Sequence, residues 1–309
     1  MRALVTGATG FAGTHLTAAL SDAGHEVFAA GGPSDDHAFP LDVNDIGTVR
    51  AALDLARPDV VFHLAAQTFV PDALVEPMAT YVPNIRGTAL VAQAVRERVK
   101  AGAAIRLVFA SSAEVYGLQR PDRFPLDETA PLNPANPYAS SKAAAELLLL
   151  GEYRAFGLDV VVARAFNHIG PGQNDRFVAP AFAVQLARIA AGGPAQLLVG
   201  NLEARRDFLD VRDVARAYVA LAERGAAGEV YNVCSGEARP VRDLLRELII
   251  LAHVPVEVRE DPQRMRPSEV PLFVGSNAKL REATGWEPLI PFRESIKDIY
   301  AAAQSTIAS

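Results

Sequence analysis

The sequence has little of what a secreted, membrane-bound or metal-dependent protein needs. Cys234 is the single cysteine among 309 residues, so no disulfide can form within the chain, which suits a reducing compartment. Six scattered histidines predict no metal site. No apolar run approaches the ~18 residues of a membrane span, and the net charge of −6 argues against a broad nucleic-acid surface. We therefore expect a cytoplasmic protein with no nucleic-acid or membrane partner.

Hydrophobic side chains, by contrast, are abundant and make up half of the chain. A chain of this length and apolar content can bury a large core, and we expect it to fold as two unequal lobes. The first expected strand begins at residue 3, which leaves no room for a signal peptide ahead of it.

A glycine-rich stretch near the amino terminus organises the rest of the chain. An apolar run over residues 3–5 predicts a strand, and a helical pattern follows over residues 14–23. A strand, a glycine-rich turn and a helix leave backbone N–H groups pointing outward, where they can bind a pyrophosphate. The spacing Gly7-x-x-Gly10-x-x-Gly13 fits the usual G-x-G-x-x-G fingerprint only loosely. It predicts a dinucleotide site, with a ligand-free glycine turn as the alternative.

The residues after the second expected strand leave the coenzyme open. That strand ends at Gly31, where an NAD-binding domain usually places an Asp or Glu for the ribose hydroxyls. Asp35 and Asp36 follow only later, and no nearby Arg is available for a 2′-phosphate. We therefore expect NADP(H), with NAD(H) also possible. Asp42, beside Val43, is a candidate acceptor for the adenine amino group, or else it caps a helix.

Buried strands alternate with helices through the first half of the chain. Strands are expected at residues 58–67 and 105–110, with a helix at 81–100 between them. This alternation predicts a parallel sheet with ligands at the carboxyl ends of its strands. We therefore expect an α/β fold, a Rossmann-like doubly wound parallel sheet with a smaller mixed α/β substrate lobe. Gln67 and Ser112 fall at such strand ends.

Tyr138 and Lys142 form the candidate catalytic pair. They follow Asn136, a suitable N-cap, and Pro137, a suitable first helical residue, so their spacing of four puts both on one helix face. An unperturbed tyrosine with a pKa near ~10 is a poor catalyst at neutral pH. A cationic lysine and the positive helix N-terminus both favour the phenolate. The pair alone is common by chance, but after a glycine-rich turn and a strand ending in two serines it is a strong signature.

Five motifs carry a resemblance to a known family. They are Thr6-Gly-Ala-Thr-Gly-Phe-Ala-Gly13, His63-Leu-Ala-Ala66, Ser112-Ala-Glu-Val-Tyr-Gly117, Tyr138-x-x-x-Lys142 and Arg206-Asp-Phe-Leu-Asp-Val211. Over essentially its whole length the chain resembles the extended short-chain dehydrogenase/reductases that act on sugar nucleotides as epimerases, dehydratases and reductases. The resemblance implies that Tyr138 exchanges a proton with the sugar O4, that Lys142 holds the nicotinamide ribose, and that Ser112 hydrogen-bonds the same oxygen.

The same resemblance implies a set of coenzyme contacts along the glycine turn and the strand ends. The expected cofactor-binding residues are Gly7, Gly10, Phe11, Ala12, Gly13, Asp42, Val43, Leu64, Ala65, Ala66, Tyr138 and Lys142.

Three further stretches resemble the enzymes that act on GDP-linked sugars, namely the GDP-4-dehydro-6-deoxy-D-mannose reductases and the GDP-mannose 4,6-dehydratases. The stretches are Ala65-Ala66-Gln67, Arg164-Ala-Phe-Asn-His-Ile-Gly-Pro-Gly-Gln173 and Arg266-Pro-Ser-Glu-Val270. Arg suits bidentate contact with phosphate, and Glu suits ribose hydroxyls or a guanine edge. For the arginines a solvated surface is the alternative. The resemblance implies a GDP-sugar substrate held by Gln67, Asn84, Asn167, Val178, Arg206, Arg266 and Glu269.

Three functions are compatible with these residues. A reductase would consume NADPH or NADH and convert GDP-4-dehydro-6-deoxy-D-mannose to GDP-D-rhamnose. A GDP-mannose 4,6-dehydratase would return the hydride with no net redox change. Glu114 stands where dehydratases carry their added acid/base, but Ala113 replaces the Asp or Ser beside it. Residues 31–40 are short and lack Arg, unlike the insertion of those dehydratases, which favours the reductase. A catalytically inactive nucleotide-sensing protein would be expected to have lost Tyr138 or Lys142.

The two lobes are expected to be assembled from alternating segments. Residues 1–167 plus 209–232 are predicted to form the dinucleotide-binding domain, with residues 230–233 as its last inner strand. Residues 168–208 plus 233–309 are predicted to form the substrate lobe. A GDP-sugar between the lobes would follow the preference of ligands for domain clefts.

Two helical stretches bear on the oligomeric state. Residues 84–100 and 140–156 have Ala- and Leu-rich faces. If the family pattern holds, these faces pair two subunits into a homodimer through a helix bundle, and burial within one chain is the alternative.

Overall fold

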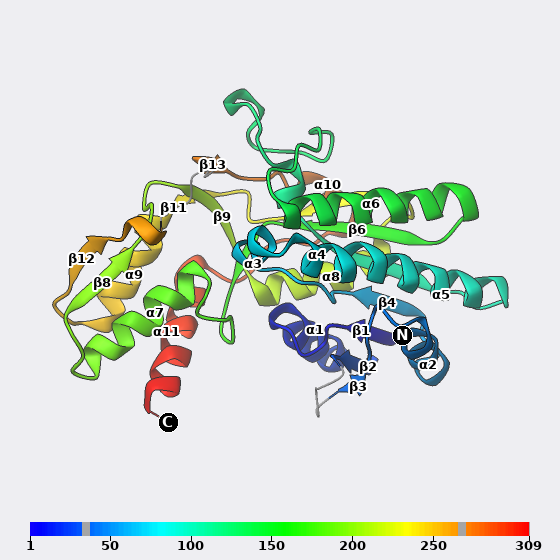
Figure 1. The fold of residues 1–309 in the computed structure, drawn as a ribbon, viewed down its shortest axis with the longest axis horizontal. Coiled ribbons are helices and arrows are strands. Elements are labelled where there is room, and N and C mark those ends of the chain that lie inside the picture. Colours follow the sequence, from blue (N-terminus) through cyan, green and yellow to red (C-terminus); the bar gives the residue numbers. More distant parts are fainter. Residues whose placement is uncertain (33–37, 265–269, 309) are drawn as a thin grey trace.

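The first lobe is built on one parallel sheet of seven strands, at the right of Figure 1. The computed structural model describes residues 1–32, 38–264 and 270–308. The strands are β1 (Arg2–Thr6), β2 (Glu26–Gly31), β3 (Phe39–Pro40), β4 (Val60–His63), β5 (Arg106–Ser112), β6 (Val160–Ala165) and β10 (Val230–Val233). Their order is β3-β2-β1-β4-β5-β6-β10, the doubly wound order 3-2-1-4-5-6 with one strand added at the edge. The predicted fold class is therefore confirmed, although β10 lies at the edge of the sheet and is not an inner strand.

Helices cover both faces of this sheet. One face carries α1 (Phe11–Asp22) and α8 (Val211–Arg224). The other carries α2 (Ile46–Ala56), α5 (Thr88–Lys100) and α6 (Pro137–Phe156). Because both faces are covered, a central strand such as β6 is buried at every position, which is why its sequence is a nearly continuous apolar run. Each fully buried Val or Leu side chain contributes roughly 1.5–3 kcal/mol.

The helix expected at residues 81–100 is divided. Helix α4 (Pro77–Tyr81) passes through a π-helical turn, Val82–Gly87, into α5, and the short α3 (Val70–Val75) precedes them. Gly87 packs so tightly that a side-chain carbon on it would lie 2.7 Å from Val43. Such π-turns occur frequently at functional sites, and this one contains Asn84.

The second lobe, at the left of Figure 1, has two small sheets of its own. One contains β7 (Asn167–Ile169), β9 (Arg205–Asp210), β11 (Ala238–Pro240) and β13 (Leu272–Phe273), and the other pairs β8 (Gln196–Val199) with β12 (Glu257–Glu260). Helices α7 (Val178–Ala190), α9 (Val241–Ala252) and α11 (Phe292–Ala308) pack together in a separate hydrophobic core. Short helical turns lie at Ala113–Tyr116, Pro121–Arg123 and Pro262–Arg264.

The segment around α10 (Ala278–Thr284) belongs with the first core. Leu280 and Trp286 pack against the β-sheet of the first lobe, and the Trp286 indole donates to the Asp213 carbonyl at 3.1 Å. The lobe boundaries at residues 168, 209 and 233 stay a prediction; α10 follows the last of them, in the segment predicted to form the substrate lobe.

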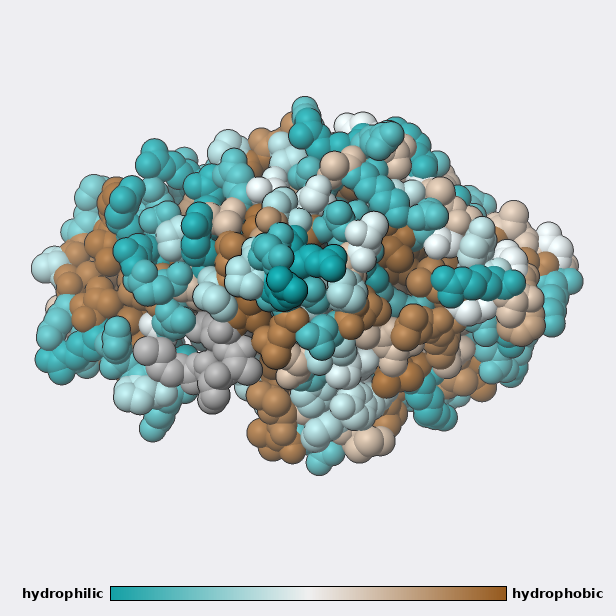
Figure 2. Space-filling model, turned by 90° about the horizontal axis from the view of Figure 1, so that it is seen from above, coloured by the Kyte–Doolittle hydropathy of each residue, from teal (hydrophilic) through white to brown (hydrophobic). Residues whose placement is uncertain are grey.

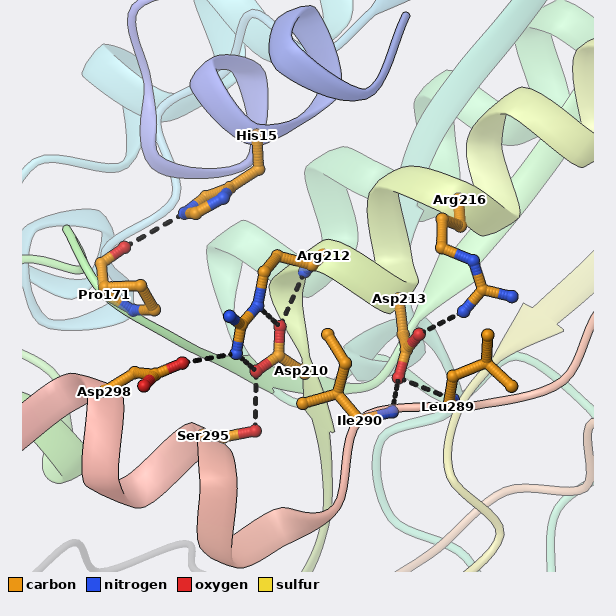
Figure 3. A network of polar contacts seen from close by, with 10 residues as sticks. All are labelled: His15, Pro171, Asp210, Arg212, Asp213, Arg216, Leu289, Ile290, Ser295 and Asp298. Atoms are coloured by element: carbon orange, nitrogen blue, oxygen red, sulfur yellow. Dashed lines mark hydrogen bonds and ion pairs between the residues drawn. The ribbon is translucent and has the colours of Figure 1, made fainter. Parts of the chain in front are cut away.

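A buried carboxylate ties the last helix to the start of α8. Asp210 ends β9 and caps α8, accepting from the Arg212 amide at 2.8 Å. Ser295 on α11 donates to Asp210 at 2.6 Å. Arg212 bridges Asp210 and Asp298, each at 2.8 Å, as Figure 3 shows. α11 is thereby anchored where the two lobes meet.

Asp213 forms a second anchor one turn further along α8. One oxygen accepts from the backbone amides of Leu289 and Ile290 at 3.0 and 2.9 Å, and the other pairs with Arg216. Figure 3 also shows His15 of α1 donating to the carbonyl of Pro171 at 3.0 Å. These bonds hold the second lobe against the first.

None of the helices within the described ranges is long and apolar enough to cross a lipid bilayer.

Candidate active site

The glycine-rich turn after β1 has the shape that a dinucleotide phosphate requires. Gly7 has φ +72°, and a side-chain carbon on it would lie 2.8 Å from the Ala65 nitrogen. A side-chain carbon on Gly13 would lie 2.1 Å from the Gly7 carbonyl oxygen, so a larger residue forces the turn apart. α1 begins at Phe11 after Gly10, with no side-chain cap and no acidic residue in its first turn. Its first N–H groups therefore have no partner within the helix and suit an anion.

A buried histidine holds the neighbouring strand end against this turn. His63 ends β4, and its ring nitrogens lie 2.8 Å from the Thr6 hydroxyl and 3.1 Å from the Thr88 hydroxyl. Burial lowers the pKa of His63 to about 3, so the ring is neutral. The Ala65 amide donates to the Thr6 hydroxyl at 3.3 Å. The predicted coenzyme segment from Leu64 onward is thereby fixed beside Gly7.

The end of β2 leaves the choice between NADP(H) and NAD(H) undecided, as the sequence did. Gly31 is its last residue, while Asp35 and Asp36 lie outside the described residues. Asp42 accepts from the Asn44 amide at 2.8 Å. Asp45, one turn later, is the N-cap of α2, so the alternative interpretation of Asp42 as the helix cap is wrong.

The structure brings Ser112, Tyr138 and Lys142 together at the carboxyl end of β5. Asn136 caps α6 by accepting from the Ala139 amide at 2.8 Å, and Pro137 begins the helix, as predicted. Tyr138 and Ser112 are each 9% exposed, so both are largely buried. The Lys142 ammonium donates to the Ala110 carbonyl at 2.7 Å.

The protonation state of Tyr138 differs from our expectation. We expected the lysine and the helix N-terminus to favour the phenolate. Instead, burial raises the pKa of Tyr138 to about 12, although a hydrogen bond with Ser112 acts in the opposite direction. The physical reason is that burial of the phenol outweighs its hydrogen bond with Ser112, and the charge of Glu114 raises the pKa further. Tyr138 is therefore protonated at neutral pH and suited to act as an acid.

Lys142 is itself perturbed by burial. Its side chain is 3% exposed, and burial lowers its pKa to about 8, while Glu146 acts in the opposite direction. Its ammonium also lies 4.9 Å from the centre of the Phe109 ring. The charge of Lys142 consequently titrates near the working range of an enzyme at neutral pH.

Glu114 lies next to Ser112. Its amide donates to the Ser112 hydroxyl at 3.2 Å, and its carboxylate accepts from the Asn136 side chain at 3.1 Å. The same Asn136 caps the helix that carries Tyr138. Glu114 therefore lies between Ser112 and the start of α6.

Two predicted substrate residues, Gln67 and Asn84, bind each other. The Gln67 amide donates to the Asn84 side chain, which donates back to the Gln67 carbonyl, both at 2.9 Å. Asn84 is 2% exposed and also donates to Ser141 at 2.9 Å. The structure therefore places Asn84 behind Gln67, where it shapes the segment after β4. The Gln67 side chain donates to the Phe69 carbonyl and accepts from Thr80.

The remaining predicted substrate residues lie in the second lobe. Asn167 is exposed in β7, and Val178, 37% exposed, begins α7. Arg206 is part-buried in β9 and donates to the Val270 carbonyl at 2.7 Å. Arg266 and Glu269 lie outside the described residues. The ring of Phe11, in the glycine turn, stacks on His168 with centroids 5.8 Å apart, so this lobe reaches the coenzyme turn next to Asn167.

Comparison with known proteins identifies the family. The family model described as GDP-mannose 4,6 dehydratase matches residues 4–299. The chain belongs to this family. It is 41% identical over 307 residues to the GDP-6-deoxy-D-mannose reductase of Pseudomonas aeruginosa, covering 99% of this chain and 98% of that protein. The predicted family resemblance is confirmed.

Solved structures of similar proteins agree with this assignment to the GDP-mannose 4,6 dehydratase family. RMD from Pseudomonas aeruginosa, complexed with NADPH, has a TM-score of 0.89 at 38% identity and covers 99% of this chain and 100% of its own. The UDP-glucose 4-epimerase of Thermus thermophilus, complexed with NAD, has a TM-score of 0.86 at 31% identity, covering 98% of this chain and 99% of its own.

Sequence reasoning missed a buried carboxylate next to Arg206 in the sequence. Asp207 is fully buried in β9. It accepts from the Ser235 amide at 2.7 Å and hydroxyl at 2.6 Å, and from the amides of Gly236 and Gly275 at 3.0 and 3.3 Å. Asp207 thereby joins β9 to the segments after β10 and β13. Its position in the Arg206-Asp-Phe motif was the available signal.

Sequence reasoning also missed a buried ion pair, Glu146 with Arg164. Glu146 is fully buried and Arg164 is 5% exposed, and their closest contact is 2.7 Å. The signal was present in the spacing, because Glu146 follows Lys142 by the same four residues that separate Lys142 from Tyr138.

Proposed function

We propose that this protein is an NAD(P)H-dependent reductase that acts on C4 of a GDP-4-keto-6-deoxy-hexose and converts GDP-4-dehydro-6-deoxy-D-mannose to GDP-D-rhamnose. The observation that carries the proposal is a protonated, buried Tyr138 beside Ser112, at a strand end next to the glycine turn. A ketone reduction needs an acid at this position from the start. The 41% identity to a GDP-6-deoxy-D-mannose reductase supports the same substrate class.

The coenzyme site fits a dinucleotide on the evidence of the turn itself. The close approach of Gly13 to Gly7 and the uncapped start of α1 suit a pyrophosphate. Lys142 would hold the nicotinamide ribose, and bound NAD(P)H supplies the hydride for C4. With Gly31 at the end of β2, no carboxylate of that strand end opposes a 2′-phosphate, so both coenzymes should bind.

The side chains of the site divide the work of proton transfer. Tyr138 donates its phenolic proton to the C4 oxygen, on which negative charge develops as the ketone is reduced. Ser112 donates a hydrogen bond to the same oxygen. Lys142, while charged, stabilises the phenolate that Tyr138 becomes. The substrate diphosphate is assigned to Asn167, Arg206, Arg266 and Glu269, with Val178 and Gln67 lining the sugar end.

Glu114 keeps a second function under consideration. A GDP-mannose 4,6-dehydratase needs an additional acid/base, and Glu114 is held beside Ser112 by Asn136. The two reactions are separated by supplying GDP-mannose alone, which a dehydratase converts without net consumption of coenzyme. We expect no conversion of GDP-mannose and rapid oxidation of NADPH when the 4-keto-6-deoxy sugar is supplied.

The proposal includes a homodimer in the cytoplasm. Large apolar side chains are exposed on neighbouring helices, including Leu147 (59%) and Phe156 (53%) on α6, Met78 (57%) on α4 and Val75 (85%) on α3. Figure 2 shows hydrophobic patches among hydrophilic residues on one face of the molecule. Exposed patches of this kind often mark protein–protein contacts. Sedimentation should give a dimer that Leu147→Glu weakens, and a monomeric wild type would overturn this part.

A further inference from the structure

Helix α6 carries a third ionisable residue in line with the catalytic pair. Tyr138, Lys142 and Glu146 follow one another at intervals of four, so they share one face of the helix. Glu146 is fully buried. Its oxygens accept from Arg164 at 3.1 Å from Nε and 2.7 Å from Nη2, and one of them also accepts from the Ser111 hydroxyl. The carboxylate therefore has one fixed position and orientation.

The partners of Glu146 lie on the strands that carry the active site. Ser111 on β5 and Arg164 on β6 are paired in register, and Ser111 immediately precedes the catalytic Ser112. The Arg164 guanidinium lies 4.8 Å from the centre of the Tyr116 ring, and the Tyr116 hydroxyl donates to Asn232 on β10 at 2.7 Å. One carboxylate thus binds α6 to two adjacent strands, β5 and β6, and Arg164 and Tyr116 continue the contacts to β10.

Stability alone does not account for this ion pair. Burying two charges carries a large desolvation cost, and apolar residues of similar volume in place of a buried pair are often neutral or stabilising. The position of the pair offers another reason, because a fixed negative charge lies one helical turn from Lys142. Burial alone would favour the neutral amine of Lys142.

The other groups around Lys142 provide little or no negative charge. His63 on β4 is neutral because burial lowers its pKa to about 3, and Tyr138 is protonated because burial raises its pKa to about 12. Arg164 on β6 is cationic and acts against a charged lysine. Glu114 lies beside Ser112, and the Glu146 carboxylate is the group whose charge raises the pKa of Lys142.

We propose that Glu146, held by Arg164 and Ser111, is a positioning residue that keeps Lys142 charged and keeps α6 in register with the strand that carries Ser112. The inference rests on the proposed reductase reaction for its purpose, because a charged Lys142 stabilises the phenolate that Tyr138 forms. Its physical content is a property of the protein without coenzyme or substrate and is tested there.

Lysine NMR of the coenzyme-free protein tests the first part directly. The chain has four lysines, Lys100, Lys142, Lys279 and Lys297, so ¹³Cε labelling gives a simple spectrum, with Lys142 assigned by its loss in Lys142→Met. Removing an opposite charge at close range shifts a pKa by about 1 unit or more. We expect Glu146→Gln to lower the titration midpoint of Lys142 by at least about that amount and to leave the other three unchanged.

Glu152→Gln is the matched control on the same helix. Glu152 also binds an arginine through both oxygens, Arg96 at 3.0 and 2.8 Å, but lies ten residues from Lys142. The Glu152→Gln substitution should leave the titration midpoint of Lys142 and the reductase activity unchanged. If Glu146→Gln leaves the Lys142 midpoint in place, or Glu152→Gln moves it as far, the proposal is wrong.

A double variant keeps the test open if Glu146→Gln does not fold. Glu146→Met with Arg164→Met removes both charges and keeps apolar volume, a replacement that folded proteins tolerate. The Lys142 midpoint should fall by less than in Glu146→Gln, because the loss of the Arg164 cation offsets part of the loss of the nearer carboxylate, and a midpoint that does not fall would overturn the proposal. In either variant the alkaline limb of kcat/KM should move to lower pH together with the Lys142 midpoint. A midpoint shift without any reductase activity in the wild type would refute the proposed function and leave the electrostatic role of Glu146 standing.

Discussion

Gly13→Ala is the substitution whose effect the structure predicts most directly. The new carbon would lie 2.1 Å from the Gly7 carbonyl oxygen and 2.8 Å from the Ala8 carbonyl carbon. Both are backbone atoms, so the turn has to open. Overpacking of a tight site typically costs about 1–3 kcal/mol. A relaxed turn no longer presents its N–H groups to the pyrophosphate, and losing this free energy from binding would raise the Kd for NADPH by roughly 5- to 150-fold.

Two other glycines provide matched controls. A side-chain carbon on Gly10, in the same turn, would contact only the Gly7 carbonyl oxygen at 3.3 Å, and nothing lies within 4 Å of one on Gly151 in α6. Gly10→Ala should therefore weaken binding less than Gly13→Ala. Gly151→Ala should leave the Kd unchanged and stabilise the helix by roughly 0.5–1 kcal/mol.

The assay is titration calorimetry with NADPH, combined with thermal unfolding of each variant. The unfolding curves show whether weaker NADPH binding comes from a local change in the turn or from a loss of overall stability. The reasoning is refuted if Gly13→Ala is folded and binds NADPH as tightly as the wild type does.

Three further predictions concern the chemistry of the site. Tyr138→Phe removes the proton donor and should lower kcat by about 10²–10⁴ with little change in coenzyme Kd; near wild-type turnover would show that another group is the acid. Because Lys142 loses its charge as the pH rises through its pKa of about 8, kcat/KM should fall above roughly that pH, and a flat profile well into the alkaline range would contradict this role. Gly31→Asp adds a carboxylate where the 2′-phosphate would lie, so the ratio of kcat/KM for NADPH to that for NADH should drop roughly tenfold or more. A wild type that already prefers NADH by about tenfold would instead indicate that another carboxylate reaches the ribose.

The sequence was sufficient for the sheet and for placing Tyr138 and Lys142 at the start of one helix because both depend on local patterns. The glycine spacing, the apolar strands and the Asn136-Pro137 start of α6 each encode their structure within a few residues. The break between α4 and α5 was missed although the sequence offers one local signal, Pro83 within the turn. The close packing of Gly87 against Val43 from a distant segment is not encoded in the helical pattern.

The electrostatics of the site could not be predicted from spacing. Lys142 lies one turn from Tyr138, as expected, and its ammonium binds the Ala110 carbonyl, but burial dominates the pKa of the phenol. Similarly, Asn84 carries the right chemistry for a ligand, yet the fold directs its amide to Gln67 and Ser141. In both cases the deciding partner comes from another part of the chain.

The most direct test of the central claim follows the hydride. The purified protein is mixed with GDP-4-dehydro-6-deoxy-D-mannose and NADPH deuterated at the transferable position, and the sugar nucleotide is examined by NMR. The account predicts stoichiometric oxidation of NADPH with deuterium at C4 of GDP-D-rhamnose. An unchanged 4-keto sugar, together with conversion of GDP-mannose to that same 4-keto product without net loss of coenzyme, would contradict it and identify a dehydratase.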